Sequence, residues 1–241
     1  MSAPLLVVTG TGTEIGKTHL AASLLVAWAR APRAAGHAAP QVLGLKPVES
    51  GVTGGRGADG ARLEQLSTFH VKRFPSPYLL ARAVSPHLAA REEGRSIDLT
   101  KVRGQVHEAR AEELLDGLVV ELAGGLFSPL GPELSNADAA LELDADGIVL
   151  VAPDRLGVLH DLGATTRAAG AMGLPLLGIV LVAPAEADLS TGSNAAEVSL
   201  VTEVPVLAVV PRAPIEELGA RADLAAIVRA FVRSPGPRRR P

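Results

Sequence analysis

Cysteine is absent from this sequence, and aromatic residues make up only 2% of it. Without cysteine, disulfides, thiolate catalysis and cysteine-ligated metal sites are excluded. With so few aromatic side chains, the hydrophobic core has to be built from Ala, Val and Leu. These residues suit buried parallel strands and the helices that cover them.

Long apolar runs and an excess of basic residues are missing as well. No apolar stretch approaches the ~20 residues that span a bilayer. The run LLVV, residues 5–8, has neither a basic region before it nor a small-residue cleavage site after it. A formal net charge of −3 gives no reason to expect nucleic acid, which favours a basic face. We therefore expect a soluble, cytoplasmic protein that binds neither membranes nor nucleic acid.

Short apolar runs alternate with helical patterns along the chain, which predicts an α/β fold with a mostly parallel sheet covered by helices on both faces. We expect a single domain over residues 1–233 and a disordered tail over residues 234–241. Residues 31–40 are expected to be a linker and residues 49–60 a glycine-rich loop. The expected strands are 5–9, 42–46, 118–122, 147–151, 176–182 and 206–210, and the expected helices are 17–30, 86–94, 99–115 (with Asp98 as its cap), 157–172, 192–202 and 215–233.

The strongest motif is TGTGTEIGKT, residues 9–18, which follows a predicted strand and opens a predicted helix. That context is typical of a phosphate-binding loop, in which backbone N–H groups and the helix dipole face an anion. Lys17 would reach the β- and γ-phosphates, and the Thr18 hydroxyl would bind Mg²⁺. Five residues separate Gly10 from Gly16, one more than in the common spacing. A chance GKT triplet is the alternative interpretation, and the flanking strand and helix argue against it.

Three residues follow predicted strands and should meet in one cleft. Gly10, Lys46 and Glu121 each lie at the carboxyl end of such a strand or directly after it, and open parallel sheets bind ligands beyond the carboxyl ends of their strands. The fold is therefore predicted to be that of the P-loop nucleoside triphosphatases. A strand-end lysine that reaches solvent and a solvated surface acid are the alternative interpretations for Lys46 and Glu121.

Several motifs in order along the chain resemble those of the dethiobiotin synthetase family. The loop GTGTEIGKT resembles that family's extended phosphate-binding loop, and KPVESG (46–51) resembles its KPVxSG motif. The resemblance covers nearly the whole chain. The further similar segments are ADGARL (58–63), SPHLAAREEG (85–94), VVELAGGLFSPL (119–130), RLGVLHDLGATTRAAGAMGL (155–174) and VLAVVP (206–211).

The resemblance implies a reaction, its cofactors and a set of site residues. The diamine 7,8-diaminononanoate would take up CO2 to give a carbamate, ATP or another nucleoside triphosphate would phosphorylate it, and the second amine would close a cyclic urea. A homodimer is implied. Thr13, Lys17 and Lys46 would be catalytic, Ser50, Lys46 and His160 would contact substrate, and Thr18, Asp59 and Glu121 would bind Mg²⁺. The implied nucleotide contacts are Glu14, Ile15, Gly16, Lys17, Thr18, His19, Asp59, Glu121, Leu122, Ala123, Gly124, Pro211, Arg212 and Ala213.

The sequence departs from the family pattern at four places. Gly12 replaces an aspartate of the loop, and Leu122 replaces a glycine beside the phosphates, a costly change if that position has a positive φ. His160-Asp161 stands where the family has Asn-His, which would reach substrate from the partner subunit. Val182-Ala183 stands where an Asn-Asp pair normally recognises adenine.

These departures leave alternatives open. One is another ligase or kinase with a different substrate on the same scaffold. Another is a nucleotide-dependent partner-binding switch of the ParA/MinD type, against which KPVESG and the lack of an evident membrane-targeting amphipathic helix argue. A third is a relative that binds nucleotide without turnover. A ring-closed urea product would distinguish the synthetase from the switch.

Overall fold

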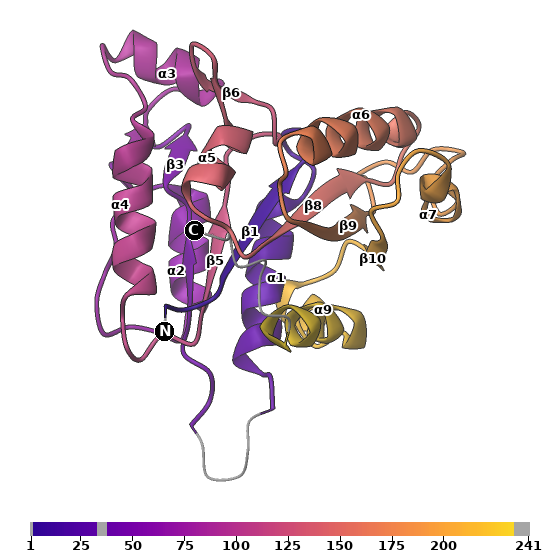
Figure 1. The fold of residues 1–241 in the computed structure, drawn as a ribbon, viewed down its shortest axis with the longest axis horizontal. Helices are drawn as coiled ribbons and strands as arrows, with labels where there is room; N and C mark the ends of the chain where they lie inside the picture. The colour runs from indigo at the N-terminus through magenta and orange to yellow at the C-terminus, as the bar shows by residue number, and fades with distance from the viewer. Residues whose placement is uncertain (1, 33–37, 234–241) are drawn as a thin grey trace.

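A six-stranded parallel sheet forms the centre of the protein, as the sequence predicts (Figure 1). The computed structural model describes residues 2–32 and 38–233. The strand order is β10-β9-β8-β1-β5-β2, so that β1 lies in the middle of the sheet. The strands are β1 (Leu5–Gly10), β2 (Val42–Leu45), β5 (Gly117–Glu121), β8 (Gly147–Pro153), β9 (Leu176–Val182) and β10 (Val206–Val210).

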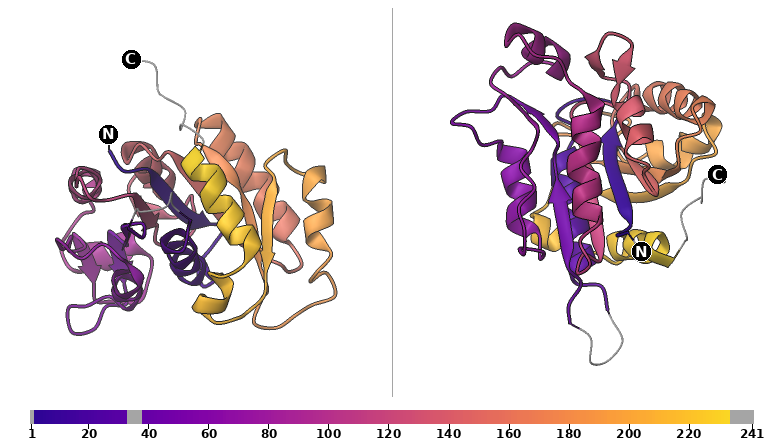
Figure 2. Two further views of the ribbon diagram at one scale, coloured as in Figure 1. Left: turned by 90° about the horizontal axis from the view of Figure 1, so that it is seen from below. Right: turned by 60° about the vertical axis from the view of Figure 1, so that its left-hand side comes forward.

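Helices cover both faces of this sheet (Figures 1 and 2). Successive strand residues point to opposite faces, so Leu6 and Val8 of β1 pack in one core cluster and Leu5 and Val7 in another. The first cluster is covered by α1 (Lys17–Ala29), α2 (Ala58–Leu66), α8 (Ile215–Leu218) and α9 (Ala222–Arg233). The opposite face is covered by α4 (Leu99–Arg110), α5 (Asn136–Glu142) and α6 (Val158–Ala171), with α3 (Pro86–Glu92) packed at its edge.

Small elements extend the domain beyond the central sheet. β3 (Val48–Ser50) pairs in parallel with β4 (Tyr78–Leu80), and β6 (Pro129–Gly131) pairs antiparallel with β7 (Leu134–Ser135). A short helix α7 (Asn194–Glu197) continues into a 3₁₀ turn, Val198–Leu200. None of the helices within residues 2–32 and 38–233 is long and apolar enough to cross a membrane.

Several predicted boundaries were wrong. The helix predicted over 215–233 is two helices, because Gly219 ends α8 against Val26 of α1, where no side chain would fit. The helix predicted over 99–115 ends at Arg110, after which the chain turns toward β5. Within 192–202 only α7 and the 3₁₀ turn form. The predicted Asp98 cap is confirmed, since its carboxylate accepts the N–H of Thr100 at 2.9 Å.

The predicted glycine-rich loop 49–60 was also wrong in part. β3 occupies its first residues and α2 begins at Ala58, and this helix was not foreseen. The glycines at 57 and 60 lowered the helical signal, because glycine is a poor helix former. The predicted tail, 234–241, and the middle of the predicted linker, 33–37, lie outside the described residues.

Candidate functional site

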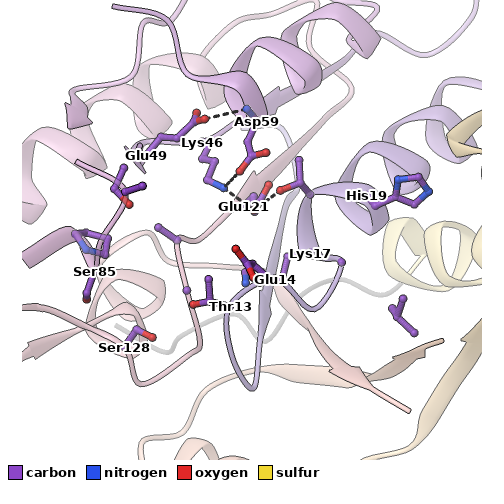
Figure 3. Close-up of a pocket in the computed structure, with 18 of the residues that line it drawn as sticks. Thr13, Glu14, Lys17, His19, Lys46, Glu49, Asp59, Ser85, Glu121 and Ser128 are labelled. Atoms are coloured by element: carbon purple, nitrogen blue, oxygen red, sulfur yellow. Dashed lines mark hydrogen bonds and ion pairs between the residues drawn. The ribbon is translucent and has the colours of Figure 1, made fainter. Parts of the chain in front are cut away.

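A cavity of about 840 Å³ opens where the carboxyl ends of the central strands meet (Figure 3). The loop after β1, the residues at and after the ends of β2 and β5, the end of β9 and the segment after β10 all contribute to its walls. This is the place where open parallel sheets bind ligands. Two of the three predicted strand-end positions, Lys46 and Glu121, line the cavity, whereas Gly10 is not among its lining residues.

The loop between β1 and α1 has the backbone of an anion site. Gly16 caps α1 with a φ of 91°, and Glu14 has a φ of 58°, a strained value for a residue with a side chain. Lys17 begins α1, is buried, and donates from Nζ to the Gly12 carbonyl at 2.6 Å. Burial lowers the pKa of Lys17 to about 8, and the attraction of Glu121 opposes that shift only in part. The Lys17 ammonium is thus fixed by the Gly12 carbonyl in a site that shields it from water.

Four side chains next to this loop form a continuous charged network. Lys46 donates from Nζ to Glu121 Oε1 at 2.8 Å and to Asp59 through a short hydrogen bond, and Thr18 donates to the same Glu121 oxygen at 2.8 Å. Burial alone would lower the pKa of Lys46, but Glu121 and Asp59 raise it above its usual value. Burial raises the pKa of Glu121 in spite of the neighbouring ammonium. Lys46 therefore stays cationic here.

The same network has the ligands for a hard divalent cation. Glu121 Oε2 is buried and has no hydrogen-bond partner among the described residues, although buried polar atoms are nearly always paired. Carboxylates of Asp59 and Glu121 and the Thr18 hydroxyl are the oxygen ligands that Mg²⁺ prefers. No group of three or more His, Cys, Asp or Glu residues in the described part of the chain could hold a metal. The residues present fit a cation that shares its ligand shell with phosphate and water.

The two ends of the cavity differ in chemistry. At one end His19 Nε2 lies 2.6 Å from the carbonyl oxygen of Ala213, which joins α1 to the segment after β10. At the other end are Ser85 and Ser128, with Lys46, Asp59 and Glu121 in between (Figure 3). The two ends of the cavity therefore present different polar groups to a ligand.

Most of the predicted site residues are brought together in this cavity. Ile15, Leu122 and His160 are the exceptions: Ile15 packs against the hydrophobic core, Leu122 is buried in it, and His160 is exposed on α6. Leu122 does not have a positive φ, so the strain considered for this replacement of glycine does not arise. The predicted site residues that line the cavity are Thr13, Glu14, Gly16, Lys17, Thr18, His19, Lys46, Ser50, Asp59, Glu121, Ala123, Gly124, Pro211, Arg212 and Ala213.

Other residues of the cavity were not predicted as site residues. Glu49, Ser85 and Ser128 stand inside segments that carry the family resemblance, and that position was the available signal. Asn136 was also missed; it is buried at the start of α5, and its amide donates to the carbonyls of Ala123 and Gly125. It thereby fixes the loop that follows Glu121. The unforeseen lining residues are Glu49, Ala83, Val84, Ser85, Pro86 and Ser128; Val182, which stands at the family's adenine-recognising position, lines the cavity as well.

Comparisons with known proteins place the chain among similar sequences. A family model described as an AAA domain matches residues 5–218. The ATP-dependent dethiobiotin synthetase BioD of Anaeromyxobacter dehalogenans is 39% identical over 213 residues, covering 87% of this chain and 90% of that protein. The synthetase of the same name from Aromatoleum aromaticum is 36% identical, covering 95% of this chain and 96% of that protein.

Solved structures with similar folds come from more distant proteins. A ParA family ATPase from Chlorobium tepidum has a TM-score of 0.56 at 14% identity, covering 97% of this chain and 100% of that one. The septum site-determining protein MinD complexed with Mg-ADP, from Pyrococcus horikoshii, has a TM-score of 0.55 at 19% identity, covering 96% of this chain and 95% of that one. These likenesses show the P-loop fold.

Proposed function

This chain belongs to the family of ATP-dependent dethiobiotin synthetases, and we propose that it joins CO2 to 7,8-diaminononanoate with a nucleoside triphosphate and Mg²⁺ to give dethiobiotin. The observation that carries the proposal is the network in which Lys46 lies between Glu121 and Asp59, beside Lys17 and Thr18 of the phosphate-binding loop. Such a network can hold two anions, a carbamate and a triphosphate, close together. The cytoplasm is the proposed location.

The reaction needs positive charge more than it needs covalent catalysis. One substrate amine attacks CO2 and loses a proton, a carbamate oxygen takes the γ-phosphoryl group from the nucleotide, and the second amine then displaces phosphate to close the ring. Lys17 would stabilise charge on the phosphates, and Lys46 would hold the carbamate. Mg²⁺ held by Thr18, Asp59 and Glu121 would neutralise further phosphate charge. Catalysis is thus mainly positioning and charge stabilisation.

Product analysis tests this function. The purified protein, given diamine, ¹³C-bicarbonate, Mg²⁺ and ATP, is expected to form a cyclic urea that carries the label, with one ADP per ring. Mass spectrometry detects the product. Slow ATP hydrolysis without ring closure would instead indicate a nucleotide switch, and nucleotide binding without hydrolysis would indicate a relative that has lost turnover. A different product with other diamines or acids would identify another ligase on this scaffold.

We expect the site to discriminate only weakly between nucleotide bases. Val182 and Ala183 offer no side-chain hydrogen bond where the family has Asn-Asp, and Val182 lines the cavity near Gly16. Most binding energy should then come from the triphosphate. We expect ATP, GTP and CTP to support turnover within about tenfold, which is ~1.4 kcal/mol. Turnover at sub-saturating concentrations of the four triphosphates measures this. A hundredfold preference for ATP would show that backbone groups around Pro211–Ala213 read the base.

A homodimer is proposed, in which His160 reaches the substrate of the partner subunit. His160 is exposed on α6, outside the cavity of its own chain, so a substrate contact requires a second copy. Leu156, in the turn before α6, is 75% exposed. A dimer interface at this end of α6 would remove that apolar side chain from water.

Subunit complementation tests this arrangement. Lys17→Ala and His160→Ala homodimers are each expected to be impaired, and their mixture is expected to regain turnover, because one site of the mixed dimer is intact. His107→Ala, an exposed histidine on α4, is the matched control and should behave like the parent. A monomer by light scattering at micromolar concentration, or a mixture without any gain, would contradict the proposal.

A further inference from the structure

Glu49 is a buried acid that the proposed chemistry does not use. It lies on β3, outside the central sheet, and its side chain is only 5% exposed. Its two carboxylate oxygens accept one backbone N–H each at 2.9 Å, Oε2 from Gly60 and Oε1 from Asp59, the latter contact drawn in Figure 3. A buried acid with both oxygens occupied in this way is bound to one specific piece of backbone.

That piece of backbone is the first turn of α2. Ala58 is the first residue of the helix, so Asp59 and Gly60 supply its second and third N–H groups. These are the donors that a capping side chain normally satisfies. The residue at the cap position is Gly57, which has no side chain, and a Cβ there would overlap the Glu49 carboxylate. Glu49 therefore caps α2 from the preceding strand β3 rather than from the cap position itself, and Gly57 leaves it the room.

The capped turn carries one of the proposed metal ligands. The Asp59 carboxylate is directed at Lys46, which also holds Glu121. Yet the Asp59 side chain is 42% exposed, so burial does not fix its position. The backbone N–H that Glu49 accepts belongs to Asp59 itself. Where the first turn of α2 lies thus decides where this carboxylate can be.

We propose that Glu49 is a positioning residue for the metal site: by capping α2 from β3 it places the Asp59 carboxylate beside Glu121 and Thr18. The inference rests on the proposed function, in which Asp59 binds Mg²⁺. A negative charge at the helix start is also attracted by the positive end of the helix dipole, so the capping geometry is favoured electrostatically. Removing a group that orients a metal ligand typically lowers metal affinity 10–100-fold.

Calorimetry with a non-hydrolysable ATP analogue, in Mg²⁺ and in EDTA, measures how much the metal strengthens nucleotide binding. Glu49→Ala is expected to reduce that strengthening by about tenfold or more, and to leave affinity in EDTA unchanged. Glu49→Gln keeps one accepting oxygen and should lose less. Glu64→Ala, on the exposed side of the same helix, is the matched control and should change neither value.

A second substitution separates helix capping from direct contact. Gly57 has extended backbone angles, φ −76° and ψ 133°, which any residue adopts at a cap. In Gly57→Asp alone, the new side chain should overlap the Glu49 carboxylate and reduce the strengthening of nucleotide binding by Mg²⁺. In the Glu49→Ala background the space is free, and Asp at position 57 can accept the same N–H groups, so the double variant should regain most of the Mg²⁺ effect.

The possible results are distinct. Loss in Glu49→Ala and recovery in the double variant support the inference. Loss without recovery would mean that Glu49 contacts a ligand itself, and would overturn it. If Mg²⁺ strengthened nucleotide binding as much in Glu49→Ala as in the parent, but no longer did so in Asp59→Asn, the positioning role would be overturned and the proposed metal site would stand. Unchanged coupling in Asp59→Asn would overturn both.

Discussion

Replacing Lys17 with alanine is expected to lower turnover by at least about a thousandfold, since removal of a single charge-stabilising group from such sites costs 10²–10³ in rate and Lys17 also holds the nucleotide. Lys17 lies at the start of α1, buried in the cavity beside Glu121 and Lys46. The measurement is labelled urea formation at saturating diamine. Lys101→Ala, an exposed lysine of α4, is the control.

Loss of Lys17 is not expected to unfold the protein. Burial lowers the pKa of Lys17 from 10.5 to about 8, so folding disfavours its charged form. The unfolded chain binds more protons than the folded one between pH 8 and 10.5, and in that window the contribution of Lys17 to stability rises with pH. Near neutral pH the variant therefore loses an unfavourable charge, and its melting temperature should stay close to that of the parent. Unimpaired turnover in Lys17→Ala would remove the phosphate-loop assignment.

Thr18→Val provides the companion measurement on the neighbouring residue. The substitution keeps the shape of the side chain but removes the hydroxyl that donates to Glu121. We expect the Mg²⁺ concentration needed for half-maximal turnover to rise, because one proposed metal ligand is lost. Affinity for nucleotide in EDTA should change little. An unaltered Mg²⁺ requirement would exclude Thr18 from the metal site.

Replacing Lys46 with glutamine is expected to lower the rate of ring closure by about a hundredfold or more, while nucleotide binding persists. The expectation follows from the position of Lys46, opposite the phosphate-binding loop and beside the serine end of the cavity. Calorimetry with the non-hydrolysable analogue decides. If nucleotide binding were lost as well, Lys46 would be a nucleotide ligand or a structural residue, and its carbamate role would fall.

The same substitution should change stability in a metal-dependent way. Without Lys46, the carboxylate of Glu121, 1% exposed, loses the ammonium to which it is hydrogen-bonded, and breaking a buried pair in this way costs about 3–5 kcal/mol. Mg²⁺ can replace the lost charge, so the metal should restore much of the melting temperature. Lys72→Gln, which breaks an exposed pair with Glu108, should cost little with or without Mg²⁺. Equal destabilisation of Lys46→Gln in Mg²⁺ and EDTA would argue against a cation near Glu121.

The sequence by itself determined the sheet and the phosphate end of the site. All six central strands were predicted, because buried parallel strands are continuous apolar runs and need no distant partner to be recognised. The loop from Thr9 to Thr18 was predicted for a similar reason: its glycines, lysine and helix start are contiguous, so its chemistry is local. Lys46 and Glu121 followed from the rule that strand ends meet at one edge.

Only the tertiary structure decided the contacts between residues far apart along the chain. The helix α2 was missed because Gly57 and Gly60 lower the local helical propensity, whereas its capping contact with Glu49 of β3 forms only in the folded protein. Leu122 joined the core and His160 faced outward because packing, rather than motif position, sets the direction of a side chain. The pairing of Lys46 with Glu121, 75 residues apart, likewise depends on the fold. Short-range patterns fix elements and loops, whereas charge networks form only when the chain brings their members together.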